Sequence, residues 1–108
     1  MSRILLIEYQ AKIFGNGHLK DFPPEGLPLE GQALKVGRSP ARDDIVIITG
    51  HHNQFFNLRK SAEGWCLWTT AANPVLLNNN PVVAVRDHLL RDGDSIGTAG
   101  TIFQYRDE

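Results

Sequence analysis

The chain has 108 residues, a length typical of one domain with a single hydrophobic core and too short for two such cores. Its 11 Lys and Arg residues nearly balance its 12 Asp and Glu residues, so no broad positive field exists to attract nucleic acid or an anionic membrane. The sequence therefore predicts one compact domain over residues 1–108, either complete or part of a longer protein, in which any anion site is local.

The N-terminal stretch and the single cysteine favour a reducing compartment. "MSRILLIEYQ" has only four consecutive apolar residues, fewer than a signal peptide or a membrane span requires. Cys66 lies in the apolar run "WCLW", where we expect a buried and inert thiol that cannot form a disulfide within the chain. The cytoplasm is therefore the expected location.

Short strands account for most of the predicted secondary structure. Six prolines and ten glycines break the sequence into pieces, and no apolar pattern of helical period persists for long. In chain order the predicted strands are Arg3–Gln10, Ala33–Val36, Ile45–Ile48, Gln54–Lys60, Trp65–Thr70, Val75–Leu77, Val82–Val85, Asp87–Leu90, Ser95–Gly97 and Thr101–Tyr105. Many short strands with turns between them are typical of an all-β sandwich or barrel.

The segments between these strands have recognisable turn chemistry. Residues 15–31 lack alternation and are predicted to form a surface loop, with Leu27 and Leu29 packed on the core. "LLNNNP" is predicted to turn because asparagine tolerates positive φ, and "RDGDS" because Gly93 can take the left-handed conformation. Trp65 and Trp68 are predicted to face opposite sides of their strand.

Four stretches carry a recognisable pattern over residues 34–105: "LKVGRSPARDDIVI", "TGHHNQFFNL", "NPVLLNNNPV" and "LLRDGDSIGTAGTIFQY". In order and spacing they resemble the forkhead-associated (FHA) domain. The resemblance implies an all-β sandwich of about eleven short, mostly antiparallel strands. It also implies a non-catalytic module whose loops at one end bind a phosphothreonine-containing segment of a partner protein.

Arg38 follows the glycine of "KVGR", where the resembled family has an arginine at its recognition edge. A dianionic phosphate requires charge-assisted donors held in place, and a guanidinium supplies them. Arg38 is therefore the leading candidate for a phosphate contact. The alternative is an ion pair with Asp43 or Asp44.

Residues 49–53 fit the family's Ser-Arg-x-His stretch in two registers. With His52 at the histidine position, Thr49 replaces the phosphate-binding serine and keeps a hydroxyl. With Asn53 there, His51 replaces the basic residue, and the apolar residues that follow fall on one strand face. The first register is favoured slightly for its chemistry. His51 is expected either to add charge to a phosphate site at acidic pH or to be a neutral surface histidine.

Asn73 matches the asparagine with which the resembled family contacts the peptide main chain. An amide suits this role because it both donates and accepts. The alternative is an Asx-type hydrogen bond that closes its own turn. Pro74 and Val75 stand where the family has Gly-Thr, so the recognition turn differs from the family's.

No catalytic, cofactor or metal motif is present. The sequence lacks a nucleophile elbow, a phosphate-binding loop and a dinucleotide fingerprint, and the adjacent His51 and His52 would point to opposite faces of a strand. We therefore expect no enzyme activity, no cofactor and no metal.

Three hypotheses for the function remain. The first is phosphothreonine binding in signalling, with Arg38 and Thr49 on the phosphate, His51 supplementary and Asn73 on the peptide backbone. The second is a phosphate-independent binding or assembly scaffold of FHA type, whose recognition loops are degenerate. The third, a small β-barrel enzyme or nucleic-acid binder, is disfavoured by the near-balanced charge and the missing motifs.

Overall fold

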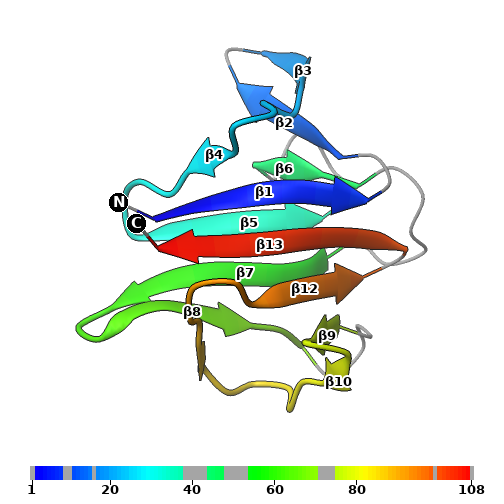
Figure 1. Cartoon of the computed structure of the whole chain (residues 1–108). Helices are drawn as coiled ribbons and strands as arrows, with labels where there is room; N and C mark the ends of the chain where they lie inside the picture. The colour runs from blue at the N-terminus through cyan, green and yellow to red at the C-terminus, as the bar shows by residue number, and fades with distance from the viewer. Residues whose placement is uncertain are drawn as a thin grey trace.

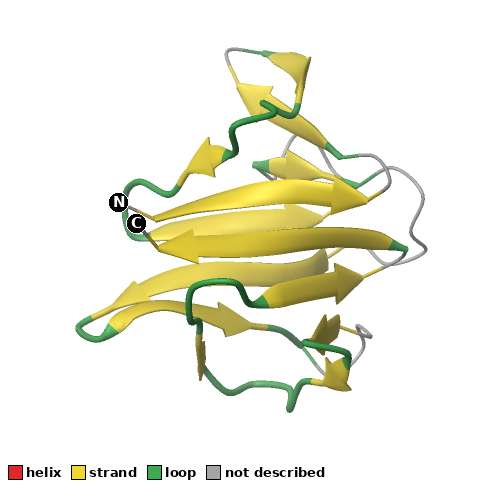
Figure 2. Ribbon diagram, in the orientation of Figure 1, coloured by secondary structure: helices red, strands yellow, loops and turns green. Residues whose placement is uncertain are grey.

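The structure is a computed structural model that describes residues 2–8, 11–15, 17–37, 44–47, 54–70, 75–98 and 100–107. All regular secondary structure in these ranges consists of β-strands (Figure 2). Over the same ranges the chain contains no helix that could cross a lipid bilayer.

Thirteen strands in the described residues form two sheets (Figure 1). The six-stranded sheet contains β1 (Ser2–Glu8), β4 (Leu27–Pro28), β9 (Val75–Leu77), β10 (Asn80–Pro81), β12 (Ser95–Thr98) and β13 (Thr101–Asp107), in the order β10-β9-β12-β13-β1-β4. The seven-stranded sheet contains β2 (Lys12–Gly15), β3 (His18–Asp21), β5 (Ala33–Gly37), β6 (Ile45–Val46), β7 (Gln54–Ser61), β8 (Gly64–Trp68) and β11 (His88–Leu89), in the order β11-β8-β7-β5-β6-β2-β3. Neighbouring strands are antiparallel except for β5 and β6, which are parallel.

The two sheets enclose one hydrophobic core. Thr101, Phe103 and Tyr105 of β13 are buried while the residues between them are partly exposed, as expected for a strand with one face on the core. Phe56 of β7 meets Phe103 edge-on, with ring centroids 6.0 Å apart, and so joins the sheets. The core residues are Ile4, Ala11, Leu29, Leu34, Val36, Ile45, Ile47, Phe56, Leu58, Trp65, Leu67, Val75, Leu90, Ile96, Phe103 and Tyr105.

The predicted fold class, an all-β sandwich, is confirmed, although thirteen strands replace the expected eleven or so. Leu29 is buried and Leu27 packs against the core, as predicted. Trp65 is buried and Trp68 is half-buried, which confirms their opposite orientations, and Cys66 is buried. Asn78 and Asn79 have positive φ values of 51° and 67°, so the predicted asparagine turn is confirmed.

Two local predictions were wrong. Residues 15–31, predicted to be a loop, contribute to β2, to the whole of β3 and to β4, and Gly17, at φ 79°, lies in the β2–β3 turn. β3 is exposed along its length, so it shows no alternation of buried and exposed residues. The predicted strand Val82–Val85 does not form; the backbone N–H of Val85 donates to the carbonyl of Thr69 instead.

Tyr105 ties the first strand to the last. Its hydroxyl lies 3.0 Å from the Ser2 hydroxyl, and the same Ser2 hydroxyl donates to Asp107 at 3.2 Å. Burial raises the pKa of Tyr105, an effect that the hydrogen bond with Ser2 opposes. The folded protein therefore holds the phenolic proton more tightly than the unfolded chain does.

Replacing Tyr105 by Phe should change how stability depends on pH. The raised pKa contributes stability that is complete below the ordinary value of 10.0 and is lost as the pH rises through the folded-state value. Tyr105→Phe should therefore lower the free energy of unfolding by about 1 kcal/mol at neutral pH, through the lost hydrogen bond, and should lessen its alkaline decline. Urea unfolding over a pH series measures both effects; an equally steep alkaline decline in both proteins would contradict the prediction.

Val85 has an unfavourable backbone conformation. It is a β-branched residue at φ 57°, and its side chain is 68% exposed. Valine in the left-handed region costs about 1–2 kcal/mol, whereas asparagine is tolerated there.

Val85→Asn should therefore raise the free energy of unfolding by about 1 kcal/mol, since little packing is lost. Val83→Asn is the matched control, because Val83 is 55% exposed and has no positive φ. Chemical denaturation of both variants tests the prediction, and an equal effect of the two substitutions would refute it.

Candidate functional site

The four residues predicted to bind the phosphopeptide, Arg38, Thr49, His51 and Asn73, lie outside the described residues. Their roles, and the register of residues 49–53, therefore stay predictions. The structure does describe the residues that precede and follow each of the three segments concerned. These flanking residues define a common end of the sandwich.

The segments 38–43 and 48–53 are bracketed by residues at one end of the seven-stranded sheet. Gly37, the last residue of β5, pairs with Gln54, the first residue of β7. The N–H of Ile47 donates to the carbonyl of Gly37 at 2.8 Å. Asp44 lies beside Lys35, because its N–H donates to the Lys35 carbonyl and its carboxylate accepts from the Lys35 N–H at 2.9 Å.

The segment 71–74 is bracketed at the same end. Trp68, the last residue of β8, pairs with Asn57 of β7, so β8 runs toward the start of β7. On the far side of the segment, Val75 of β9 pairs with Thr98, the last residue of β12. The contact between Phe56 and Phe103 places the starts of β7 and β13 over one another. In Figure 1 these strand ends lie together at the right of the view.

We call this region the loop end, defined by Gly37, Ile47, Gln54, Thr70 and Val75. The core residues next to it are firmly buried: Val36, Phe56 and Val75 have at most 2% of their surface exposed. A packed core under connecting segments is the arrangement by which β-sandwiches hold binding loops in fixed positions. The alternative pairing of Arg38 with Asp43 or Asp44 also stays a prediction, because Arg38 and Asp43 lie outside the described ranges.

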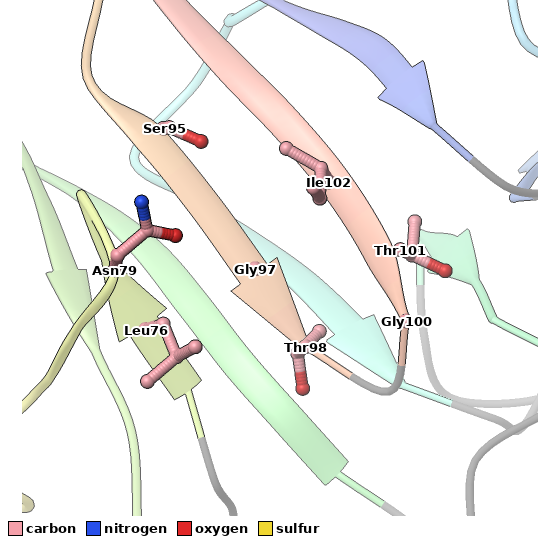
Figure 3. Close-up of a pocket in the computed structure, with 8 residues that line it drawn as sticks. All are labelled: Leu76, Asn79, Ser95, Gly97, Thr98, Gly100, Thr101 and Ile102. Carbon is pink, nitrogen blue, oxygen red and sulfur yellow. The ribbon is translucent and has the colours of Figure 1, made fainter.

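A pocket of about 360 Å³ opens on the outer face of the six-stranded sheet, next to the loop end. In Figure 3, Gly97 lies on the strand between Leu76 and Ile102, and Gly100 lies beyond the end of that strand. The residues that line it are Leu76, Asn79, Ser95, Gly97, Thr98, Gly100, Thr101 and Ile102. Sequence reasoning missed this pocket, although the small residues of "SIGTAGT" were an available signal.

Metal ligands do not gather in the described part of the chain. There, no three His, Cys, Asp or Glu side chains come together in an arrangement that could hold a metal ion. The geometry thus offers a loop end and an apolar pocket, which are features of a binding surface.

A scan against protein-family models gives no match, and a search of curated proteins gives none either. Solved structures do match. The FHA domain of an Arabidopsis thaliana hypothetical protein has a TM-score of 0.68 and 23% identity, over 97% of this chain and 83% of that chain. The FhaA FHA domain complexed with the intracellular domain of Rv3910 has a TM-score of 0.69 and 19% identity, over 98% and 100%.

A third match is the yeast Dun1 FHA domain in complex with a doubly phosphorylated (pT) peptide derived from Rad53 SCD1. Its TM-score is 0.63 and its identity 15%, over 97% of this chain and 72% of that chain. The resemblance found in the sequence is confirmed for the fold: this chain has the fold of FHA domains.

Thr101 carries an unsatisfied hydroxyl at the loop end. The residue is fully buried, and in the described part of the structure its Oγ1 atom has no hydrogen-bond partner. A buried polar atom without a partner is destabilising by its desolvation alone.

Thr101→Val should therefore raise the free energy of unfolding by about 1 kcal/mol. Thr69→Val is the control, because Thr69 is 2% exposed and its hydroxyl donates to the Thr70 carbonyl at 3.4 Å. The control should be destabilised by a similar amount. Thermal and urea unfolding compare the two, and destabilisation of both would show that the Thr101 hydroxyl has a partner.

Proposed function

We propose that this chain is a non-catalytic interaction module that binds a phosphothreonine-containing segment of a partner protein, in cytoplasmic signalling. Arg38 and Thr49 contact the phosphate, His51 adds charge, and Asn73 binds the peptide main chain. The observation that carries the proposal is that the described residues on either side of all three segments meet at one end of an FHA fold. Several structural neighbours are complexes with phosphorylated peptides, which also supports it.

The chemistry of Arg38, Thr49 and Asn73 is consistent with that task. A guanidinium and a hydroxyl supply donors to a phosphate, and an amide pairs with a main chain whatever its side chains are. The net charge of −1 provides no general attraction for anions, so selective binding would depend on these local donors.

The alternative is a phosphate-independent binding or assembly scaffold whose recognition loops are degenerate. Two observations favour it: Pro74 replaces a glycine of the family's recognition turn, and the apolar pocket around Gly97 provides a second surface. An apolar pocket binds through buried area and does not need a phosphate.

The two functions are distinguished by a degenerate phosphothreonine peptide library and its unphosphorylated counterpart. We expect the wild-type protein to bind only the phosphorylated library and Arg38→Ala to bind it at least about tenfold more weakly, since a charge-assisted contact is lost. Asn73→Ala should weaken binding of every peptide that the wild type selects, because its contact is with the main chain.

Arg91→Ala is the matched control. Arg91 lies in the turn whose Gly93 N–H donates to the Tyr105 carbonyl, near the opposite end of β13. It should leave affinity unchanged, as measured by fluorescence anisotropy. Equal binding of both libraries by the wild type would reject phosphothreonine recognition in favour of the scaffold.

A further inference from the structure

The outer face of the six-stranded sheet carries an apolar row with a gap in it. Gly97 of β12 pairs with Leu76 of β9 on one side and with Ile102 of β13 on the other. Cross-strand partners point to the same side of a sheet. Because Ile96 and Phe103, their neighbours along β12 and β13, are fully buried in the core, this row faces outward.

Gly97 leaves an open hollow between two aliphatic side chains (Figure 3). Apart from its chain neighbours, a Cβ atom placed on Gly97 would meet no atom closer than the Cβ of Leu76, at 3.9 Å. The hollow belongs to the pocket of about 360 Å³ described above. A cavity of about 150 Å³ already holds a benzene molecule, so this hollow has room for a branched aliphatic side chain from outside the molecule.

The row continues beyond the hollow in exposed aliphatic residues. Ile102 pairs with Glu8 of β1, at a bulge that also contains Ile7. Ile7 is 52% exposed and Leu76 is 38% exposed. Apolar area left in water on neighbouring strands would be stabilised by a partner that covers it.

This face is complementary in shape to a second copy of itself. Gly97 and Ile102, the hollow and the side chain beside it, are direct partners on adjacent strands about 4.8 Å apart. A two-fold axis parallel to the strands and midway between β12 and β13 exchanges their positions. Each Ile102 then lies over the Gly97 of the other copy, and Leu76 lies against the other copy's Ile7. Such isologous contacts are the commonest way in which identical chains associate.

Polar residues further along β12 and β13 are compatible with the same axis. Ser95 pairs with Gln104, so the exchange places the Gln104 amide opposite a hydroxyl. Arg106 lies over the turn of the second copy that contains Asp92, the residue with which it already forms a long ion pair of 3.9 Å within one copy. Cations and carboxylates therefore alternate across the contact. The strands of the two faces are parallel, in keeping with the angle of about 30° between aligned packed sheets.

We propose that a second copy of this chain covers the outer face of the six-stranded sheet, with each Ile102 in the hollow over the other copy's Gly97. β9, β12, β13 and β1 provide roughly 400–500 Å² per copy, from the strand spacing and the rise per residue. This is about half the area of a standard interface, so the dimer is weak, with a Kd on the order of 10–100 µM. Because the axis is parallel to the strands, both loop ends lie at the same end of the dimer. The proposal does not depend on phosphothreonine binding.

Sedimentation velocity from about 5 to about 500 µM measures the association. Wild-type protein should change from monomer to dimer over this range. Gly97→Val should remove the dimer, because the valine fills the hollow while a Cβ at this position is accommodated within one copy. Ile102→Ala should weaken the dimer about tenfold, because the hollow is then left unfilled. Leu89→Ala is the matched control and should have no effect, since Leu89 is 41% exposed on the other sheet.

The double variant Gly97→Val/Ile102→Ala tests the two-fold arrangement itself. It moves the bulky side chain from β13 to β12, and the same axis then sets the introduced valine of one copy against the introduced alanine of the other. Association lost in Gly97→Val should therefore return in the double variant. In ¹⁵N–¹H spectra of the wild type, the backbone amides of Gly97 and Ile102 should shift on dilution, whereas that of Lys20, on the exposed edge strand β3, should not.

Wild-type protein that stays monomeric throughout the concentration range would overturn the proposal, even if the face binds a different protein. A dimer that Gly97→Val leaves unchanged would overturn it as well, because the contact would then lie elsewhere. So would a double variant that is folded by circular dichroism and yet remains monomeric. The dilution spectra need no variant, so they decide the matter if a substitution disturbs folding.

Discussion

The contact between Phe56 and Phe103 is the constraint on which the arrangement of this molecule depends. Each ring lies two residues inside the start of its strand, and each strand belongs to a different sheet. Their edge-on packing fixes how the sheets lie over one another, and neither ring has room to move because both are fully or almost fully buried. The first residues of β7 and β13, which belong to different sheets, consequently lie at the same end of the sandwich.

This alignment explains how residues from distant parts of the chain can serve one site. Antiparallel pairing of β5 with β7 and of β7 with β8 brings the connections between strands to one end of the seven-stranded sheet, and the pairing of β9 with β12 does the same in the other sheet. The strands position the connecting segments, and side chains on connecting segments can then form a binding site. The apolar pocket around Gly97 flanks that end on the six-stranded sheet, and Arg59 stacked on Trp68 lies on the seven-stranded sheet.

Sequence reasoning predicted most of the elements that have one buried face and missed the fully exposed strand β3. The alternation in residues 101–105 predicted a strand, and the asparagines at 78 and 79 predicted a turn. Both predictions were possible because burial and positive φ each favour particular residue types. All residues of β3 are exposed, so its sequence has no hydrophobic pattern from which a strand could be predicted. Val82–Val85 has the composition of a strand, but the hydrogen bond from Val85 to Thr69 holds it in a turn. The proximity of Lys35, Asn57 and Trp68 could not be predicted, because these residues are far apart in sequence and become neighbours only through strand pairing.

The exposed strand β3 has a consequence for how the molecule behaves in a concentrated solution. It forms one edge of the seven-stranded sheet, where unpaired backbone groups could accept a strand from a second molecule. His18, Lys20 and Asp21 are all exposed on this short strand, and Asp21 forms an ion pair with Lys12 of β2. A strand added at this edge would have to desolvate these polar and charged groups, so the edge itself opposes edge-to-edge aggregation.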